Sequence, residues 1–487
     1  MRTLLIVENV ASPTSRVVKQ LRSATERGWS AKVVVRGPVD PRSRRASDTW
    51  ETVVLPSDFA HVLDSHRRER IAELGQHLAE TQKELSEQLE LLQNRPSVQP
   101  DDTSRPELQA LHERVDELKA SAQRTALQKR VLHEATRTPS PYGRPFPFGD
   151  PLRLEEHWYE LAAHLASLDW DVGQAADLDT LPPLVWAAQS SGGARGVVYD
   201  AHEIYPELAH LPEVHRPAWR EIARTFIPHT AAVMATSDAM AAQMVQRYST
   251  QQPTVIKNHP SVDDRAVRDV RQQAGLPPSA SVAVHIGGLR ENRNPARLVE
   301  VLEAVPELHL VCLGVSMDAA GTSQVRALAE QCGVAARLHL LPPVDHELIV
   351  AAVQVADVSL ITYGPDDTNL ELMLPNKLFE SVAAGVPVVA VDGTAAAWHV
   401  QSHGIGATFP PDAPGEIAPT VRRVLTEPSF RQRAKECAAA HTWKAVEADY
   451  LRVLDGVVAS LQPGIDNRSQ ANGDAGHDSS DEKGATT

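Results

Sequence analysis

The stretch LPNKLFESVAAGVPVVA, residues Leu374–Ala390, predicts a loop, a helix, a glycine stop and a buried strand. Pro375 suits the first turn of a helix, because its missing N–H has no partner to lose there. Gly385 ends the helix, and the valines after it form the apolar run of a parallel strand covered on both faces. The start of such a helix directs free backbone N–H groups and the Lys377 ammonium to one place, which suits a phosphate. Glu380, one turn further along, can accept hydroxyl hydrogen bonds, as from a ribose.

Short apolar strands alternate with helices on both sides of this stretch, which is typical of parallel doubly wound sheets. In the N-terminal part we expect strands at residues 3–7, 31–35, 51–55, 171–176, 196–199 and 232–235. In the C-terminal part we expect them at residues 282–286, 308–313, 338–341, 358–361 and 386–391. The fold class is therefore α/β, with two Rossmann-like doubly wound domains and a helical hairpin inserted into the first.

The composition narrows the range of functions. The chain has 487 residues and a formal net charge of −15, which argues against nucleic-acid binding by bulk charge. Its three cysteines are widely spaced, so a reducing compartment is favoured and no metal site is expected. The first residues predict a strand rather than a signal peptide, and no apolar run is long enough for a membrane span. We expect a cytoplasmic protein, at the inner face of the membrane if it touches one.

Residues 64–135 break the alternation of strands and helices. Apolar residues recur there at near-heptad spacing, in two sets separated by a polar, proline-containing linker: Ile71, Leu74, Leu78, Leu85, Leu89 and Leu92, then Leu108, Leu111, Val115 and Leu118. This pattern predicts two antiparallel helices. Three interpretations stay open: a hairpin packed on its own body, a homodimer formed through residues 65–132, and a surface for peripheral membrane contact.

Two further segments have a biased composition. Thr138–Pro151 is rich in proline and aromatic residues, and we interpret it as an ordered irregular loop. Residues 464–487 are polar and acidic, which predicts a disordered tail.

The Leu374–Ala390 run resembles the donor-binding segment of retaining glycosyltransferases of the GT-B fold, specifically the family 4, or group 1, enzymes. Glu380 matches the second acid of that family's E-x7-E signature. Leu372 stands where the first acid is expected, and Glu371 is one residue out of register. The resemblance implies an N-terminal acceptor domain over residues 1–262, a donor domain over residues 263–445, and a helix at residues 446–463 that crosses back to the first domain.

The resemblance also implies the reaction. A sugar would pass from a nucleotide-diphosphate sugar, with UDP or GDP favoured, to a glycan, lipid or small-molecule acceptor with retention of configuration. No cofactor and no metal are implied. Arg293, Lys377 and the helix N-terminus would stabilise the leaving diphosphate.

On the donor side, the strand–turn–helix VHIGGLRENRNPARLVEVL from Val284 to Leu302 resembles the family's first donor-domain loop. Gly287 and Gly288 would let the backbone approach a ligand, and Arg290 and Arg293 would face it. A solvated arginine at a helix start is the plainer interpretation of Arg293. Four more residues are implied to contact the donor: Pro343, Val344, Asn376 and Leu378.

On the acceptor side, ADLDTLPP (Ala176–Pro183) and VYDAHEIYPE (Val198–Glu207) each follow a strand and place polar groups at its carboxyl end. The resemblance implies two candidates for catalysis, Asp177 and His202. Asp177 matches the acid of the family's His-x-His-Asp string, whose two histidines are absent here, and His202 is a possible substitute for them. A buried histidine that ties loops together is the plainer interpretation of His202. Candidates for the acceptor are Asp179, Glu203 and Arg16, whereas Glu207 is expected to pack or cap a helix.

Two other functions stay open from the sequence. Nucleotide-sugar 2-epimerases share the GT-B architecture and would suit a loop rich in histidine and acid. A non-catalytic GT-B-like protein that acts through its helical hairpin would explain Leu372 and the missing histidines.

Overall fold

The computed structural model describes residues 2–9, 13–35, 49–55, 59–93, 105–137, 151–190, 195–209, 211–248, 250–263, 265–289, 294–317, 320–366 and 368–461. Several predictions fall outside these ranges. They concern the proline-rich loop before residue 151, the acidic tail, and the two arginines Arg290 and Arg293.

The first domain is built on a seven-stranded parallel sheet with strand order β3-β2-β1-β4-β5-β6-β7. Its strands are β1 Thr3–Glu8, β2 Ser30–Val35, β3 Glu51–Val54, β4 Val172–Ala176, β5 Gly196–Ala201, β6 Ala232–Ala235 and β7 Thr254–Val255. Every residue of β1 is buried, as expected of a central strand with helices on both faces. The doubly wound sheet is confirmed, and only the two-residue edge strand β7 was not predicted.

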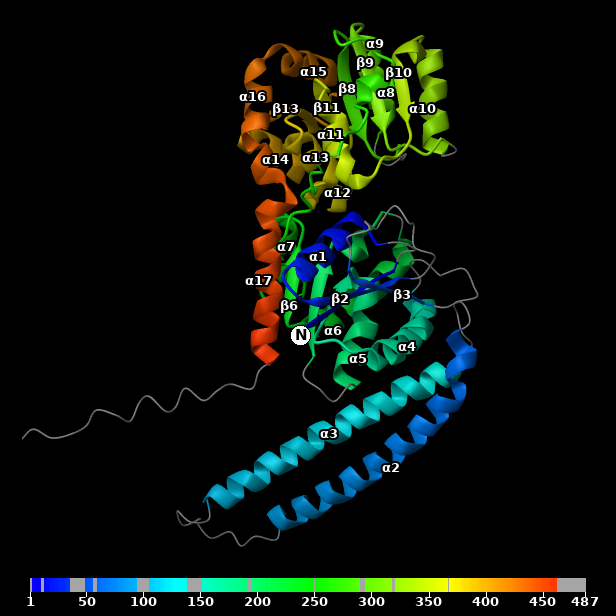
Figure 1. The fold of residues 1–487 in the computed structure, drawn as a ribbon, viewed down its shortest axis with the longest axis vertical. Helices are drawn as coiled ribbons and strands as arrows, with labels where there is room; N and C mark the ends of the chain where they lie inside the picture. The colour runs from blue at the N-terminus through cyan, green and yellow to red at the C-terminus, as the bar shows by residue number, and fades with distance from the viewer. Residues whose placement is uncertain are drawn as a thin grey trace, which may run out of the picture.

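Helices cover both faces of this sheet (Figure 1). They are α1 Ser15–Glu26, α4 Pro151–Ser167, α5 Leu181–Ser190, α6 Arg216–Phe226 and α7 Asp238–Tyr248, with short 3-10 turns at Leu178–Thr180, Tyr205–Glu207, Glu213–His215 and Ile227–His229. One face packs on a cluster that contains Trp158 and Trp219, and the other packs on α1 and the C-terminal helix.

The residues between β3 and α4 form the hairpin of α2 (Phe59–Gln93) and α3 (Arg105–Arg137). The helices run antiparallel, because Arg114 of α3 pairs with Glu84 of α2 at 2.7 Å while Lys129 lies against Gly75. The α2–α3 hairpin projects from the first domain, and α3 also contacts α4 and α5 (Figure 1).

The second domain has a six-stranded parallel sheet with strand order β10-β9-β8-β11-β12-β13. Its strands are β8 Ser281–Ile286, β9 Leu308–Leu313, β10 Leu338–Leu341, β11 Val358–Leu360, β12 Val388–Val391 and β13 Gly406–Phe409. The edge strand β13 was not predicted, because it starts with a glycine. That glycine is required: a Cβ at Gly406 would lie 1.8 Å from the Val388 carbonyl oxygen.

The helices of the second domain are α8 Val270–Gln273, α9 Ala296–Ala304, α10 Ala320–Gln331, α11 Ile349–Val353, α12 Thr368–Leu372, α13 Asn376–Ala383, α14 Ala395–His403, α15 Ile417–Thr426 and α16 Pro428–Cys437. Short 3-10 turns lie at Ala335–Arg337, His346–Leu348, Pro414–Glu416 and, as η11, Ala438–His441.

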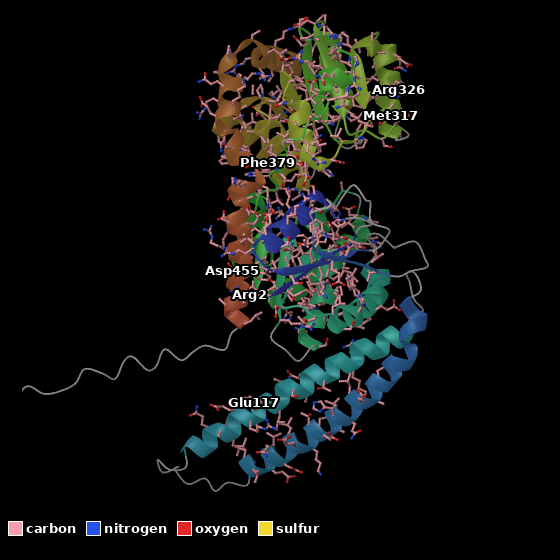
Figure 2. The ribbon with its side chains drawn as sticks, viewed as in Figure 1. Arg2, Glu117, Met317, Arg326, Phe379 and Asp455 are labelled. Atoms are coloured by element: carbon pink, nitrogen blue, oxygen red, sulfur yellow. The ribbon has the colours of Figure 1, made fainter. Side chains whose placement is uncertain are left out.

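The last helix, α17 (Trp443–Leu461), runs back along the first domain (Figure 1). The Trp443 indole N–H donates to the Ser23 hydroxyl at 2.8 Å, and the Tyr450 hydroxyl donates to the Gln174 side chain at 3.2 Å. At the far end, Asp455 accepts from Arg2 at 3.1 Å (Figure 2). The C-terminal helix is therefore part of the first domain's fold.

The segment around α12 fastens the second domain to the first. The Asn369 side chain makes two hydrogen bonds to the backbone of Ile204, at 2.8 and 3.2 Å. The Ser237 hydroxyl donates to the Leu372 carbonyl at 2.7 Å. These contacts hold the carboxyl edges of the two sheets close together.

Candidate functional site

A cavity of about 590 Å³ lies between the two domains. Loops at the carboxyl edges of both sheets line it. The first domain and the linker contribute Thr14, Ser15, Arg16, His202, Glu203, Thr236 and Asn258. The second domain contributes Ile286, Gly287, Leu313, Gly314, Pro343, Val344, His346, Ile349, Met373, Leu374, Pro375, Asn376, Lys377 and Glu380. We call it the interdomain cavity.

Helix α13 points its N-terminus into this cavity. Pro375 is its N-cap residue, in an extended conformation, rather than a residue of the first turn as predicted. Gly385 follows the helix with a φ of +69°, which explains the glycine. Leu378 requires a correction. Its side chain is fully buried in the core and its N–H donates to the Pro375 carbonyl at 3.0 Å, so it does not line the cavity.

Lys377 is held in place by a residue that the sequence analysis missed. The Lys377 ammonium lies 3.2 Å from Nε2 of His285, a buried residue of β8. The other ring nitrogen, Nδ1, lies 3.3 Å from the Leu360 carbonyl, which can only accept. His285 therefore carries its proton on Nδ1 and offers a lone pair to the ammonium. This contact fixes the cation at the mouth of α13.

Glu380 sits one turn behind Lys377, beside a second missed residue, Lys19 of α1. Burial raises the pKa of Glu380 to about 7, against the opposing effect of Lys19 and Lys377. Burial, helped by the nearby Arg16 charge, lowers the pKa of Lys19 to about 7. The pKa values of Glu380 and Lys19 are therefore both about 7, so both side chains change charge near neutral pH. Lys19 lies on the side of α1 opposite the apolar residues Val17, Leu21 and Ala24, so the hydrophobic pattern carries no signal for it.

Lys19 also starts a bridge between the domains. Its ammonium donates to the Asn258 side-chain oxygen at 2.8 Å, and the Asn258 amide donates to Asn376 at 2.6 Å. The first residue of α13 is thus tied to α1 through the linker.

The second glycine-containing loop lies opposite α13. Gly287 has a φ of +91° and lines the cavity, whereas Gly288 does not line it. Pro343 and Val344 line it, and their contact with a donor stays a prediction. Arg290 and Arg293 lie outside the described residues, so their assignment stays a prediction.

Arg16 borders the cavity, but its guanidinium is occupied inside the first domain. Its Nε and Nη2 donate to Asp200 at 2.9 and 2.7 Å, and Nη1 donates to the Ile256 carbonyl at 2.8 Å. The side chains of the pair are 2% and 0% exposed. The assignment of Arg16 to the acceptor is therefore corrected, because this charge closes the base of the cavity instead of facing an acceptor.

His202 lies between two carboxylates. Its Nδ1 is 3.5 Å from Asp177 and its Nε2 is 3.3 Å from Asp200. Burial opposes protonation, but the two carboxylates outweigh it and raise the pKa of His202 to about 9. The ring is cationic at neutral pH, with both nitrogens engaged. It lines the cavity as a fixed positive group and does not suit the role of a general base.

Asp177 and Asp179 lie behind the cavity and do not line it. Asp177 accepts from the His202 backbone N–H at 3.1 Å and has a φ of +71°, and burial raises its pKa. Asp179 accepts from Asn9 at 2.5 Å, and burial raises its pKa to about 7. These residues shape the loop that carries His202. Glu203 does line the cavity.

Glu207 has a packing role, as expected. Its carboxylate accepts from Arg216, Arg220 and Arg247 at 2.8–3.1 Å, and it does not line the cavity.

The position of the missing acid has a structural explanation. The Leu372 side chain packs against the first domain's core cluster, so a carboxylate there would be desolvated. Glu371 is exposed and lines a different cavity of about 540 Å³, together with Trp398. Neither residue places an acid in the interdomain cavity.

Comparison with known proteins agrees with this arrangement. Residues 267–441 match the family Glycosyl transferases group 1. The match lies in the second domain and covers about a third of the chain. The match includes β8, α13 and the loops that line the donor side of the cavity.

Curated relatives of this chain include D-inositol 3-phosphate glycosyltransferases. That of Catenulispora acidiphila is 26% identical over 249 residues, which is 47% of this chain and 57% of the relative. That of Corynebacterium efficiens is 24% identical over 307 residues, 59% of this chain and 69% of the relative. The matched region spans little more than half of the first of these relatives and about two thirds of the second.

Solved structures share the whole fold. Sucrose-phosphate synthase from Thermosynechococcus elongatus aligns with a TM-score of 0.59 at 13% identity, over 94% of this chain and 100% of that protein. Anabaena HepE in complex with UDP and glucose also aligns at 0.59 and 13%, over 93% of this chain and 100% of that protein. This similarity establishes the GT-B fold that the sequence predicted. None of the proteins named here is a nucleotide-sugar 2-epimerase.

Proposed function

We propose that this protein transfers a sugar from a nucleotide-diphosphate sugar to an acceptor. The observation that carries the proposal is the interdomain cavity. The N-terminus of α13, Lys377 and Glu380 line it from the second domain. His202 and Glu203 line it from the first domain.

The donor side suits a nucleoside diphosphate. A diphosphate at the mouth of α13 meets the Lys377 ammonium and the positive end of the helix together. Glu380, one turn deeper, is placed to accept hydrogen bonds from ribose hydroxyls. HepE, a protein of the same fold, binds UDP, which supports UDP as the first nucleotide to assay, with GDP second.

We further propose retention of configuration without a metal. Lys377 and the helix N-terminus would offset the charge that develops on the leaving diphosphate, with Arg293 as a further predicted cation. The departing phosphate would take the acceptor's proton on the same face of the sugar. Since His202 is cationic, it would stabilise negative charge in the cavity instead of removing that proton.

The acceptor is the least defined component. The curated relatives act on D-inositol 3-phosphate, so this compound is the first acceptor to assay. Glu203 is the acceptor-side carboxylate that we propose contacts its hydroxyls.

The test is turnover. The full chain is incubated with UDP- and GDP-sugars, with and without D-inositol 3-phosphate and in the presence of EDTA, and released nucleoside diphosphate is measured. NMR of the product reports the anomeric configuration. The Lys377→Met variant is expected to lose activity, whereas Lys444→Met, a control at an exposed lysine of α17, keeps it. Interconversion of the sugar without an acceptor would favour an epimerase, and the absence of any turnover or nucleotide binding would favour a non-catalytic protein.

We also propose that the α2–α3 hairpin forms a homodimer through residues 65–132. Leu91 on α2 is a large apolar side chain that is 56% exposed, next to Leu92 of the heptad-spaced set. Light scattering should give twice the chain mass for the parent and a smaller mass for Leu91→Glu. An unchanged monomer mass in both would eliminate the idea.

Membrane contact by the α2–α3 hairpin is the competing proposal, together with a location at the inner face of the membrane. No helix in the described part of the chain has the length and apolarity to cross a membrane. Cosedimentation with anionic vesicles, abolished by removing the hairpin, is the result expected for peripheral binding.

A further inference from the structure

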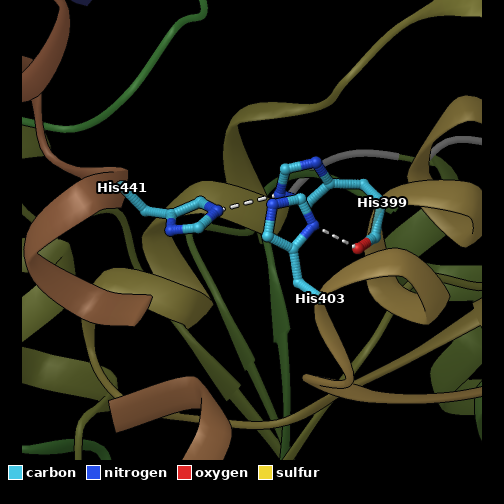
Figure 3. A group of neighbouring side chains, drawn as sticks. All are labelled: His399, His403 and His441. Carbon is cyan, nitrogen blue, oxygen red and sulfur yellow. Dashed lines mark hydrogen bonds between the residues drawn. The ribbon is translucent and has the colours of Figure 1, made fainter. Parts of the chain in front are cut away.

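Three histidines from two separate segments of the sequence meet behind helix α13. His399 and His403 lie on α14, and His441 ends the turn η11 (Figure 3). One ring nitrogen of each lies within 4.8 Å of the others. The His441 ring points toward the two rings of α14, which stack with their centroids 4.1 Å apart (Figure 3).

Backbone carbonyls fix the protons of two of these rings. Nδ1 of His403 lies 2.9 Å from the His399 carbonyl, and Nδ1 of His441 lies 2.8 Å from the Cys437 carbonyl. Because a carbonyl only accepts, each Nδ1 carries the proton and each Nε2 carries a lone pair. Metal-bound histidines are oriented in the same way, with the second nitrogen donating to a carbonyl or carboxylate.

The Nε2 atoms of His399 and His441 face each other at 2.8 Å. In the absence of an ion this contact is a hydrogen bond, for which the His399 ring must carry a proton on Nε2. Coordination of one ion by both rings needs the nitrogens to separate to about 3.3 Å, the spacing that a tetrahedral site with bonds of about 2.0–2.1 Å requires. For this pair the shift is about half an ångström. The nitrogen of His403, which lies within 4.8 Å of the other two, must approach to the same spacing. His403 is only partly buried and can therefore adjust and admit an ion from solvent.

We propose that His399, His403 and His441 bind a divalent transition-metal ion, with Zn²⁺ as the representative ion. Three imidazole nitrogens are a donor set that suits zinc, copper, iron and nickel, and they leave a fourth position for water. No metal site was predicted, because only the cysteines were considered. His399 and His403 have the i, i+4 spacing of helical metal ligands, but the third histidine lies 42 residues after His399.

The position of this three-histidine site indicates a structural role. His441 immediately precedes Thr442 and α17, which crosses back to the first domain. An ion would join the start of that crossing helix to α14 of the second domain. The rings of His399 and His441 also pack against Phe379 of α13, at centroid distances of 5.6 and 6.0 Å, and Phe379 lies at the junction of the domains (Figure 2).

A fourth imidazole stands close by. His259, in the linker between the domains, packs on Phe379 and has its centroid 5.5 Å from that of His441. It is 4% exposed, and its Nε2 is buried without a hydrogen-bond partner in the described part of the chain. An unpartnered nitrogen at this depth is unfavourable unless something polar reaches it. An ion with bound water beside it is one such group.

The experiment titrates Zn²⁺ into the metal-stripped full chain, purified with a tag that contains no histidine. Calorimetry gives the stoichiometry, and substitution with Co²⁺ gives a visible absorption spectrum that reports the ligand set. We expect about one ion per chain and a higher melting temperature with Zn²⁺. His403→Gln, at a partly buried position that tolerates the change, is expected to abolish both effects.

The matched control is His309→Gln. Nδ1 of His309 lies 3.1 Å from Nε2 of His339 on the neighbouring strand. His309→Gln therefore also removes one ring of a histidine pair, but this pair has no third ligand in the described part of the chain. Binding that is kept in His309→Gln and lost in His403→Gln supports the site. Absence of binding by the parent, binding kept in His403→Gln, or equal loss in both variants overturns it. Circular dichroism of each variant shows that it is folded, and His441→Gln repeats the test on the other element.

Discussion

The Arg16–Asp200 pair gives a prediction that separates a structural role from an acceptor role. The pair is bidentate and fully buried, and Asp200 accepts further hydrogen bonds from Gln20 and Gln174 at 2.7 and 3.2 Å. In Arg16→Met the charge of Asp200 keeps only His202 and these amides, and the Ile256 carbonyl loses its donor. Breaking a buried pair by removing one partner costs about 3–5 kcal/mol. Because His202 remains, we expect the lower end, about 3 kcal/mol.

For a domain of this size that loss lowers the melting temperature by about 6–12 °C. The assay is thermal unfolding followed by circular dichroism, with Arg2→Met as the control. Arg2 also pairs with an aspartate, Asp455, but both side chains are more than a third exposed. The control is therefore expected to change stability by less than about 1 kcal/mol.

If Arg16→Met melts like Arg2→Met while the KM for the acceptor rises sharply, the structural interpretation of Arg16 is wrong. The same result would restore its assignment to the acceptor.

Three further predictions follow from the same contacts. Folding raises the pKa of His202 from 6.5 to about 9. The stabilisation that protonated His202 provides is therefore complete below pH 6.5 and lost as the pH rises through 9. His202→Gln should flatten the dependence of the melting temperature on pH over this range. Leu372→Glu, which restores the family's acid, should lower stability by about 1–3 kcal/mol without improving donor affinity, because the side chain packs on the first domain's core; tighter donor binding in isothermal titration would contradict this. Gly287→Ala and Gly275→Ala both place alanine at positive φ, and each should lower the free energy of unfolding by about 1–2 kcal/mol. Only Gly287→Ala should also weaken nucleotide binding, because Gly287 lines the cavity. Equal nucleotide affinities in the two variants would argue against a donor role for the glycine loop.

The strands and helices were largely predictable, because they follow from local patterns. The apolar runs predicted eleven strands of the two sheets. The missed strands β7 and β13 are edge strands whose pairing depends on neighbours and not on their own residues. A glycine under a neighbouring carbonyl, as at Gly406, has no signature in a single sequence.

The donor side of the cavity was predictable for a similar reason. Asn376, Lys377 and Glu380 lie within the first turn and a half of one helix, so their spacing alone places them together. The acceptor side depends on contacts between distant residues. Arg16 and Asp200 are separated by 184 positions, and the sequence gives no sign that they pair. The same is true of Lys19 beside Glu380, and of the three-histidine site.

The central claim is that the interdomain cavity binds a nucleoside diphosphate through Lys377 at the mouth of α13. Isothermal titration of the full chain with UDP, GDP, ADP and dTDP tests it most directly, with Lys377→Met and the exposed-lysine control Lys444→Met measured beside it. We expect that one nucleotide binds selectively, that Lys377→Met weakens its affinity about 10- to 150-fold, and that Lys444→Met leaves it unchanged. Binding of no nucleotide, or equal affinity in the parent and Lys377→Met, would contradict the account.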